Sequence, residues 1–130
     1  MSAPCRLKLI SPHGRRPMAQ NLYQHSIEAC IRCAQECEHC GEACLEETDV
    51  GMLADCIRMD KDCAEMCWLA AALMSRGSHF AAEVCGVCAD ICDACADECE
   101  RHKDMEHCMR CARECRRCAE ACRAMTTAQV

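Results

Sequence analysis

The cysteines of this chain recur with the period of an α-helix, at positions where a helix normally carries its buried apolar side chains. In the segment CIRCAQECEHCGEAC, residues 30–44, successive cysteines are three, four, three and four residues apart. At about 100° per residue, such positions fall within an arc of roughly 80° on a helix, whereas a strand would divide them between its two faces. The residues between the cysteines are mainly charged or small. The pattern predicts a helix with thiols on its buried face and a solvated opposite face.

The same pattern recurs along the chain. Residues 85–99 and 108–122 place their cysteines with the same spacings. A fourth segment, residues 52–74, has a mixed stripe on its inner arc, made of Met52, Cys56, Met59, Asp60, Cys63, Cys67, Ala70 and Met74. We therefore expect four helices that each turn one face toward a common core.

Short connections between these segments determine the predicted topology. They are residues 48–51, 75–78 and 101–104, with Thr48 or Asp49, Ser78 and Asp104 as the candidate N-caps. Because short connections make consecutive helices antiparallel neighbours, the predicted fold class is all-α, an antiparallel up-down-up-down four-helix bundle with a cysteine-lined core. The predicted domains are an irregular N-terminal arm at residues 1–17, the four-helix bundle at residues 18–125 and a C-terminal tail at residues 126–130.

Composition shows that ordinary apolar residues cannot fill this core. Leu, Ile, Val and Phe together make up 17 of the 130 residues, and 19 residues are cysteine. The first share lies below the roughly 20% under which chains tend not to fold by apolar burial alone, and the second exceeds the ~8–10% that marks an unusual cysteine-based architecture. Alanine and cysteine must therefore supply most of the core.

Charge and hydropathy exclude several classes of function. The formal net charge is −6, and the sequence shows neither a basic face nor aromatic stacking residues, so nucleic acid is not an expected partner. No segment approaches the roughly 18 apolar residues of a membrane span, so we expect no membrane association. Arg15 and Arg16 form a twin arginine, but no apolar stretch follows them. We therefore expect a cytoplasmic protein whose cysteines are thiols by default.

Packing and disulfide formation are weak explanations for so many thiols. Leucine fills a core better than cysteine and does not oxidise. Neighbouring cysteines on one helix have Cβ atoms about 5–6 Å apart, whereas a disulfide needs roughly 3.5–4.5 Å. Metal binding is the chemistry that uses every stripe.

Ligand chemistry favours Cu(I) as the metal, with many ions per chain. Thiolate is the preferred ligand of Cu(I), although Zn(II) and iron–sulfur clusters also accept it. The CxxC pairs lie inside predicted helices rather than in the tight loops of structural zinc sites. Ferredoxin motifs end in a cysteine followed by proline, and no cysteine of this chain is followed by proline. An iron–sulfur or thiol-redox protein and a zinc or cadmium buffer remain the alternatives.

The predicted metal ligands are the cysteines of the four stripes, with other groups at one end of the bundle. The cysteines are Cys30, Cys33, Cys37, Cys40, Cys44, Cys56, Cys63, Cys67, Cys85, Cys88, Cys92, Cys95, Cys99, Cys108, Cys111, Cys115, Cys118 and Cys122. The further candidates, which the topology brings to one end, are His102, His107, Met52, Met59 and Asp60. The opposite end is expected to be closed by Leu22, Ile27, Leu73, Met74, Phe80 and Met125. Residues expected outside the core are Cys5, His13, His25, His39 and His79.

The CxxCxxxCxxCxxxC stripe, repeated within residues 18–125, resembles that of the bacterial copper storage proteins, specifically their cytosolic branch. The resemblance implies a four-helix bundle that takes many Cu(I) ions into its cysteine core, usually as a homotetramer, with copper entering at one end past His and Met residues. It therefore implies cytosolic copper storage or sequestration, with a copper-donor or acceptor protein as a partner. The sequence shows no nucleophile paired with a base and no phosphate-binding loop, so we do not expect an enzyme.

Overall fold

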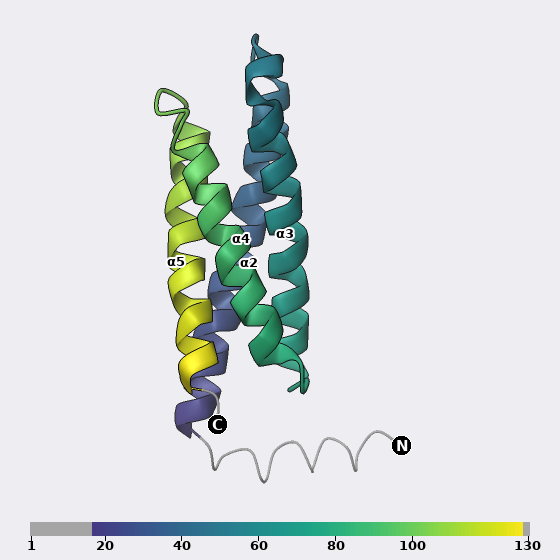
Figure 1. Ribbon diagram of the computed structural model, residues 1–130, viewed down its shortest axis with the longest axis vertical. Helices are drawn as coiled ribbons and strands as arrows, with labels where there is room; N and C mark the ends of the chain where they lie inside the picture. Colours follow the sequence, from purple (N-terminus) through teal and green to yellow (C-terminus); the bar gives the residue numbers. More distant parts are fainter. Residues whose placement is uncertain (1–16, 129–130) are drawn as a thin grey trace.

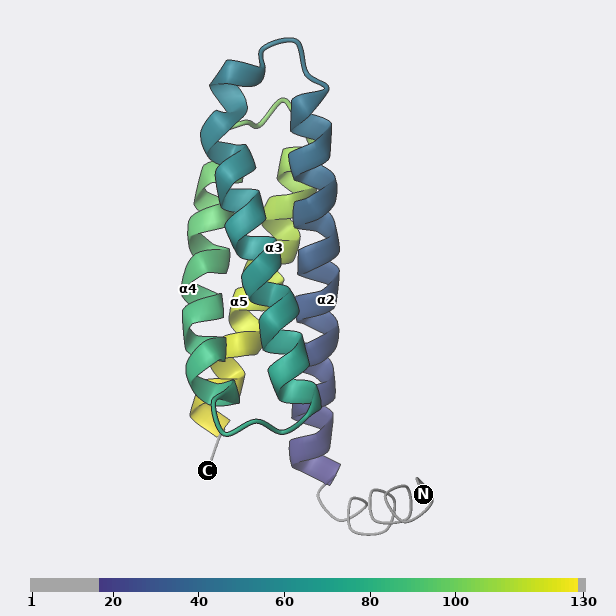
Figure 2. The same ribbon diagram turned by 90° about the vertical axis from the view of Figure 1, so that its right-hand side faces the viewer.

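The computed structural model describes residues 17–128, within which the chain forms four α-helices and one short 3-10 helix. The α-helices are α2 (Pro17–Leu45), α3 (Ala54–Ser75), α4 (Ala81–Cys99) and α5 (Glu106–Ala128), and the 3-10 helix η1 (Val50–Leu53) precedes α3. Consecutive helices run antiparallel, and α2 and α4 each pack against both α3 and α5 (Figure 1, Figure 2). The predicted all-α, up-down-up-down four-helix bundle is confirmed.

The two ends of the bundle differ in what they connect. The upper end, at the top of Figure 1, holds η1 and the α4–α5 connection, whereas the lower end holds the α3–α4 connection and the end of α5. The helices extend beyond the predicted range 18–125 in both directions, because α2 begins at Pro17 and α5 continues to Ala128. Residues 1–16, with Cys5 and His13, and residues 129–130 lie outside the described residues.

The predicted N-caps do not directly precede α3, α4 or α5, and backbone turns lie at the helix starts. Asp49 precedes η1 but makes no side-chain cap hydrogen bond, and α3 follows Leu53. The Ser78 hydroxyl accepts a hydrogen bond from the Phe80 N–H at 3.0 Å, yet α4 begins only after Phe80. Helix α5 begins at Glu106, so Asp104 is not adjacent to it. Carbonyls three residues earlier accept amides at these starts, in the pairs Met52 to Asp49, Ala81 to Ser78 and Cys108 to Met105, each at 3.1 Å.

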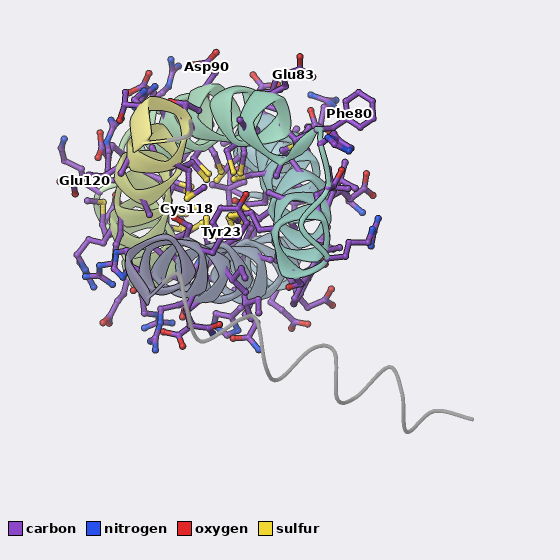
Figure 3. The ribbon with its side chains drawn as sticks, turned by 90° about the horizontal axis from the view of Figure 1, so that it is seen from below. Tyr23, Phe80, Glu83, Asp90, Cys118 and Glu120 are labelled. Carbon is purple, nitrogen blue, oxygen red and sulfur yellow. The ribbon has the colours of Figure 1, made fainter. Side chains whose placement is uncertain are left out.

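Thiols and alanines make up the middle of the core, and larger side chains lie at its ends. All 18 cysteines within residues 17–128 are fully buried. Figure 3 shows sulfur atoms gathered inside the bundle when it is seen from below. Leu53 is buried beside the upper end, and Met74 and Met125 are buried at the lower end. Because cysteine and alanine are small, their burial stabilises the fold less than burial of leucine at the same positions would.

Two side chains predicted at the ends of the core are instead exposed. Phe80, in the α3–α4 connection, is 63% exposed and lies at the periphery in Figure 3. Met52 is 69% exposed, because residues 50–53 form η1 and the tighter turn gives the inward position to Leu53. Ile27 and Leu73 are half-buried and pack against the core, as predicted. The side chain of Leu22 lies outside the described residues.

A serine continues the thiol stripe of α2 toward the lower end. Ser26 lies four residues before Cys30, in the same helical register, and is fully buried. Its hydroxyl donates a hydrogen bond to the Ala121 carbonyl of α5 at 3.1 Å. The buried hydroxyl is therefore satisfied, and oxygen replaces sulfur at this position of the stripe.

The outer faces are mainly charged. Arg116 of α5 forms ion pairs with Asp93, Asp97 and Glu100 at 3.0, 2.7 and 2.9 Å, so it joins α5 to the α4 side of the bundle. Trp68 and Leu69 of α3 form an apolar exception, since they are 40% and 43% exposed.

Among the helices of residues 17–128, none combines the length and the apolar character that crossing a membrane requires.

Gly77 ends α3 in a conformation that glycine adopts with little strain. Its φ is 62°, and the Ser78 N–H donates to the Leu73 carbonyl at 2.9 Å while the Gly77 N–H donates to the Met74 carbonyl at 3.2 Å. We expect Gly77→Ala to lower the free energy of unfolding by about 1 kcal/mol, because a Cβ disfavours positive φ. Urea unfolding of the reduced protein, followed by circular dichroism, would measure the loss.

Gly51→Ala is the matched control for this variant. Gly51 has no positive φ, and a Cβ built there would contact nothing within 4 Å. Its substitution should change the free energy of unfolding by less than about 0.5 kcal/mol. Equal losses in the two variants would contradict the role given to Gly77.

Candidate metal centre

The four stripes meet in layers to which each helix contributes a thiol. One layer consists of Cys33 of α2, Cys63 of α3, Cys92 of α4 and Cys115 of α5. The Cys63 Sγ lies 3.9 Å from that of Cys33, 3.7 Å from that of Cys92 and 3.9 Å from that of Cys115. The Cys33 Sγ lies 4.0 Å from that of Cys92 and 3.7 Å from that of Cys115. Residues up to 82 positions apart in the sequence thus form one compact group of sulfur atoms.

Neighbouring layers share thiols, so the sulfur atoms form a continuous column. Sets whose ligand atoms all lie within 4.8 Å of one another include Cys30, Cys88, Cys118 and Cys122; Cys33, Cys67, Cys92 and Cys118; and Cys37, Cys95, Cys111 and Cys115. Cys118 belongs to both the first and the second of these sets. Cys33 belongs both to the second set and to the layer of Cys33, Cys63, Cys92 and Cys115. This follows from the spacing: successive cysteines lie about one turn apart on α2, α4 and α5, and antiparallel packing sets the stripes of the four helices face to face.

The cysteines of residues 17–128 are free thiols. Their shortest Sγ–Sγ distances, such as that between Cys30 and Cys122, are 3.6 Å, whereas a disulfide bond is about 2.0 Å long. Burial raises the pKa of Cys44 to about 11. Hydrogen bonding with Cys122, together with burial, raises the pKa of Cys85 above its ordinary value. Such thiols carry protons at neutral pH, and a metal ion that binds them must displace those protons.

Asp60 places a carboxyl group inside the thiol column. It is 1% exposed, in agreement with its predicted place on the inner arc of residues 52–74. Its Oδ1 accepts S–H hydrogen bonds from Cys95 at 3.3 Å, Cys111 at 3.4 Å and Cys99 at 3.8 Å, and its Oδ2 accepts one from Cys56 at 3.9 Å. Burial, with smaller contributions from Cys111 and Cys56, raises the pKa of Asp60 to about 9. The carboxyl group is therefore protonated at neutral pH.

His107 joins the thiols at the upper end. Its Nδ1 lies 3.6 Å from the Sγ of Cys40, 3.6 Å from that of Cys108 and 4.0 Å from that of Cys44. Its Nε2 lies 3.1 Å from Oε2 of Glu47. Because a carboxylate only accepts, this contact assigns the ring proton to Nε2 and leaves the Nδ1 lone pair toward the thiols. Although His107 lies off the cysteine stripe of α5, its ring reaches the thiols of α2 from the first turn of the helix.

The other predicted ligands have fewer contacts with the column. His102 lies in the α4–α5 connection, and its Nε2 lies 3.1 Å from Oε2 of Glu98. Met59 is half-buried beside the core, and Met52 is exposed. The structure thus brings Asp60 and His107 to the thiols, and it leaves Met52 outside. Within residues 17–128, His25, His39 and His79 are exposed, as predicted.

Glu47 is a residue of this centre that the sequence reasoning missed. It lies three residues after Cys44, so it continues the spacing of the α2 stripe by one further step. That spacing was the available signal. Neither the spacing nor the composition could show that its partner would be His107, 60 residues away.

Comparisons with known proteins identify the family to which the chain is similar. The model of the copper storage protein family, Csp, matches residues 19–127. The Cu(I)-bound copper storage protein BsCsp3 of Bacillus subtilis is 48% identical, with a TM-score of 0.77 over 81% of this chain and 98% of that chain. A cytosolic copper storage protein from Streptomyces lividans, described as loaded with five coppers, is 42% identical, with a TM-score of 0.82 over 85% of this chain and 97% of that chain.

A curated relative matches a shorter region. The uncharacterized cysteine-rich protein YhjQ of Bacillus subtilis (strain 168) is 50% identical over 62 residues, which are 48% of this chain and 57% of that protein. The match therefore spans little more than half the length of this relative. The family match, in contrast, covers all four helices except the termini of α2 and α5. On this match and on the similarity to BsCsp3 over nearly all of that chain, the chain belongs to the copper storage protein family.

Proposed function

We propose that this protein stores Cu(I) in the cytosol by binding many ions through cysteine thiolates inside the four-helix bundle. The observation that carries the proposal is the column of 18 buried thiols within residues 17–128. The names of its relatives support both the binding of Cu(I) and the cytosolic location, since one relative is Cu(I)-bound and another is described as cytosolic.

The arrangement of the thiols suits Cu(I). The Sγ atoms of Cys33, Cys63 and Cys115 form a nearly equilateral triangle with sides of 3.9, 3.7 and 3.9 Å. Cys67, Cys88 and Cys92 form another, with sides of 3.7, 3.6 and 3.9 Å. Soft thiolates favour Cu(I), which accepts two or three such ligands. One Cu(I) also neutralises one thiolate, so a core filled with about one ion per cysteine is close to neutral, and burial of unpaired charge is avoided.

The alternatives fit the geometry less well. An iron–sulfur cube holds its cysteines apart around the iron and sulfide atoms, whereas the thiols here contact one another directly. A thiol-redox protein needs a thiol that a partner can reach, and the described cysteines are fully buried. A zinc or cadmium buffer would place several dianionic four-thiolate sites in the core, at a high cost of burying charge. Storage of this kind is a non-enzymatic role.

Uptake of copper is proposed at the upper end, where His107 and Asp60 lie. His107 is close to three thiols and its side chain is 13% exposed, so it lies between solvent and the column. His102 and Met59 lie nearby as secondary candidates for ligands, and Met52 is exposed where a copper-donor protein would approach.

The exposed Trp68 and Leu69 support a contact between subunits, which is consistent with the expected homotetramer.

Anaerobic titration with Cu(I) tests the proposal. The reduced, metal-free protein would be titrated in the presence of a competing Cu(I) chelator, and the ions retained per chain would be counted. We expect roughly one ion per core cysteine, because each Cu(I) compensates one thiolate. Saturation at a few ions, or ready loss to a modest chelator, would refute storage.

A matched pair of variants locates the ions within the column. Cys63→Ser removes a thiol that contacts thiols of all three other helices, and it should lower the number of ions retained. His79→Ala removes an exposed histidine of the α3–α4 connection and should leave that number unchanged. An unchanged number in Cys63→Ser would show that the ions lie elsewhere.

A further inference from the structure

Four side chains at the upper end form a ligand set of mixed chemistry. Cys40 and Cys44 of α2 face His107 and Cys108 of α5, and their ligand atoms all lie within 4.8 Å of one another. The set therefore offers three thiols and one imidazole nitrogen. This composition is typical of four-coordinate structural zinc sites.

Five of the six distances in this set lie within about 0.5 Å of the edges of a zinc tetrahedron, and the sixth, between Cys40 and Cys44, is within 4.8 Å. With Zn–S bonds of about 2.3 Å and Zn–N bonds of about 2.0–2.1 Å, a tetrahedron has S–S edges of about 3.8 Å and S–N edges of about 3.5 Å. The His107 Nδ1 lies 3.6, 3.6 and 4.0 Å from the sulfur atoms of Cys40, Cys108 and Cys44. The Cys108 Sγ lies 3.9 Å from that of Cys40 and 4.0 Å from that of Cys44. Small side-chain rotations would suffice to seat an ion.

Glu47 orients the imidazole as zinc-binding histidines are commonly oriented. Its Oε2 lies 3.1 Å from the His107 Nε2 and accepts the ring proton there. A carboxylate partner of this kind fixes the tautomer, directs the other nitrogen toward the metal and raises its basicity. Because Glu47 is more exposed than the thiols, its own charge stays solvated.

Charge distinguishes this set from the all-cysteine sets deeper in the column. Zn(II) with three thiolates and a neutral imidazole carries a net charge of −1, whereas Zn(II) with four thiolates carries −2. The second charge would be buried among sets such as Cys30, Cys88, Cys118 and Cys122, which are fully buried. The upper set therefore favours Zn(II), and Cu(I) gains no comparable advantage from exchanging a thiolate for an imidazole.

We propose that Cys40, Cys44, His107 and Cys108 bind one Zn(II) ion, which joins α2 to α5 at the upper end while the core is free of Cu(I). This site goes beyond copper storage, since it concerns a second metal at a defined stoichiometry. It rests on the ligand set and not on the number of Cu(I) ions that the column holds.

The test is a titration of the reduced, metal-free full chain with Zn(II) against a chromophoric zinc chelator. We expect one Zn(II) per chain to be retained. Substitution with Co(II) should give the intense visible d–d bands of a tetrahedral site together with thiolate-to-cobalt charge transfer. Absence of a retained equivalent, or a Co(II) spectrum without tetrahedral bands, would overturn the proposal.

Two pairs of variants assign the ion to this set. His107→Ala should weaken the retained equivalent more than Glu47→Ala does, and Glu47→Ala should weaken it by about 10- to 100-fold. The controls are His79→Ala, which removes an exposed histidine of the α3–α4 connection at the opposite end, and Glu46→Ala, which removes an exposed neighbour of Glu47. Both controls should retain the ion as tightly as the original chain.

Unchanged zinc affinity in His107→Ala would place the ion at an all-cysteine set and overturn the assignment. The Cu(I) count of the original chain is measured separately. A full Cu(I) count without a retained Zn(II) would therefore overturn this inference and leave copper storage intact. A retained Zn(II) with a low Cu(I) count would overturn copper storage and leave this inference intact.

Discussion

Loading the reduced protein with Cu(I) is expected to raise its midpoint temperature of unfolding by about 20 °C or more. An ion that binds only the folded chain at 1,000 times its Kd stabilises that chain by about 4 kcal/mol. Thiols of all four helices meet in a single layer, as Cys33, Cys63, Cys92 and Cys115 do, so bound ions crosslink the helices. Five such ions would contribute about 20 kcal/mol, more than the entire stability of about 5–15 kcal/mol that is usual for a domain.

Thermal unfolding followed by circular dichroism under anaerobic conditions would measure this shift. The midpoint should rise stepwise with the number of Cu(I) equivalents added. The matched control adds the same copper together with excess of a strong Cu(I) chelator, which should leave the midpoint of the metal-free protein unchanged. A loaded protein that unfolds at the metal-free midpoint would show that copper does not bind within the folded core.

Asp60→Asn is expected to stabilise the metal-free protein by up to about 4 kcal/mol at pH 7. The pKa of Asp60 is raised from 3.8 to about 9 in the folded chain. Below pH 3.8 the group is protonated in both the folded and the unfolded chain. Between pH 3.8 and about 9 only the unfolded chain releases the proton, so stability falls by as much as about 1.4 kcal/mol per pH unit. Asparagine keeps the carbonyl acceptor for the surrounding thiols and never ionises.

Urea unfolding of both proteins from pH 4 to pH 9 would check the sign of this effect. The two free energies should be similar near pH 4 and diverge as the pH rises, with the variant the more stable. Asp62→Asn is the control, because Asp62 lies two positions away on the same helix and is exposed. Parallel pH profiles for Asp60→Asn and the original chain would contradict a protonated carboxyl group in the core.

The helices and the thiol column were predictable because their signal is periodic. The three-four spacing of cysteines determines which face of each helix is buried, and short connections determine that consecutive helices are antiparallel. The same rule extends to Ser26 and Glu47, which follow the spacing at the two ends of the α2 stripe. It also placed Asp60 close to the inner face of α3, where the structure buries it completely.

Side chains at the ends of the helices were predicted less well, because there the spacing no longer determines direction. The spacing predicts Met52 on the α3 stripe, but η1 changes the helical register and turns it to solvent. The topology predicts Phe80 at the closed end, but it lies in a connection and not on α4. The contact of His107 with Cys40 depends on the relative height of α2 and α5. The sequence of one helix does not encode that height.

Ser26 shows that the number of thiols is independent of the backbone. The residue occupies a fully buried position of the α2 stripe, in register with Cys30, and its side chain differs from that of cysteine by one atom. Asp60 and Ala70 occupy comparable positions of the α3 stripe without contributing sulfur. Single substitutions at such positions would add or remove a metal ligand while helix length and packing stay the same. Storage capacity can therefore vary among related chains, by small steps, on one unaltered scaffold.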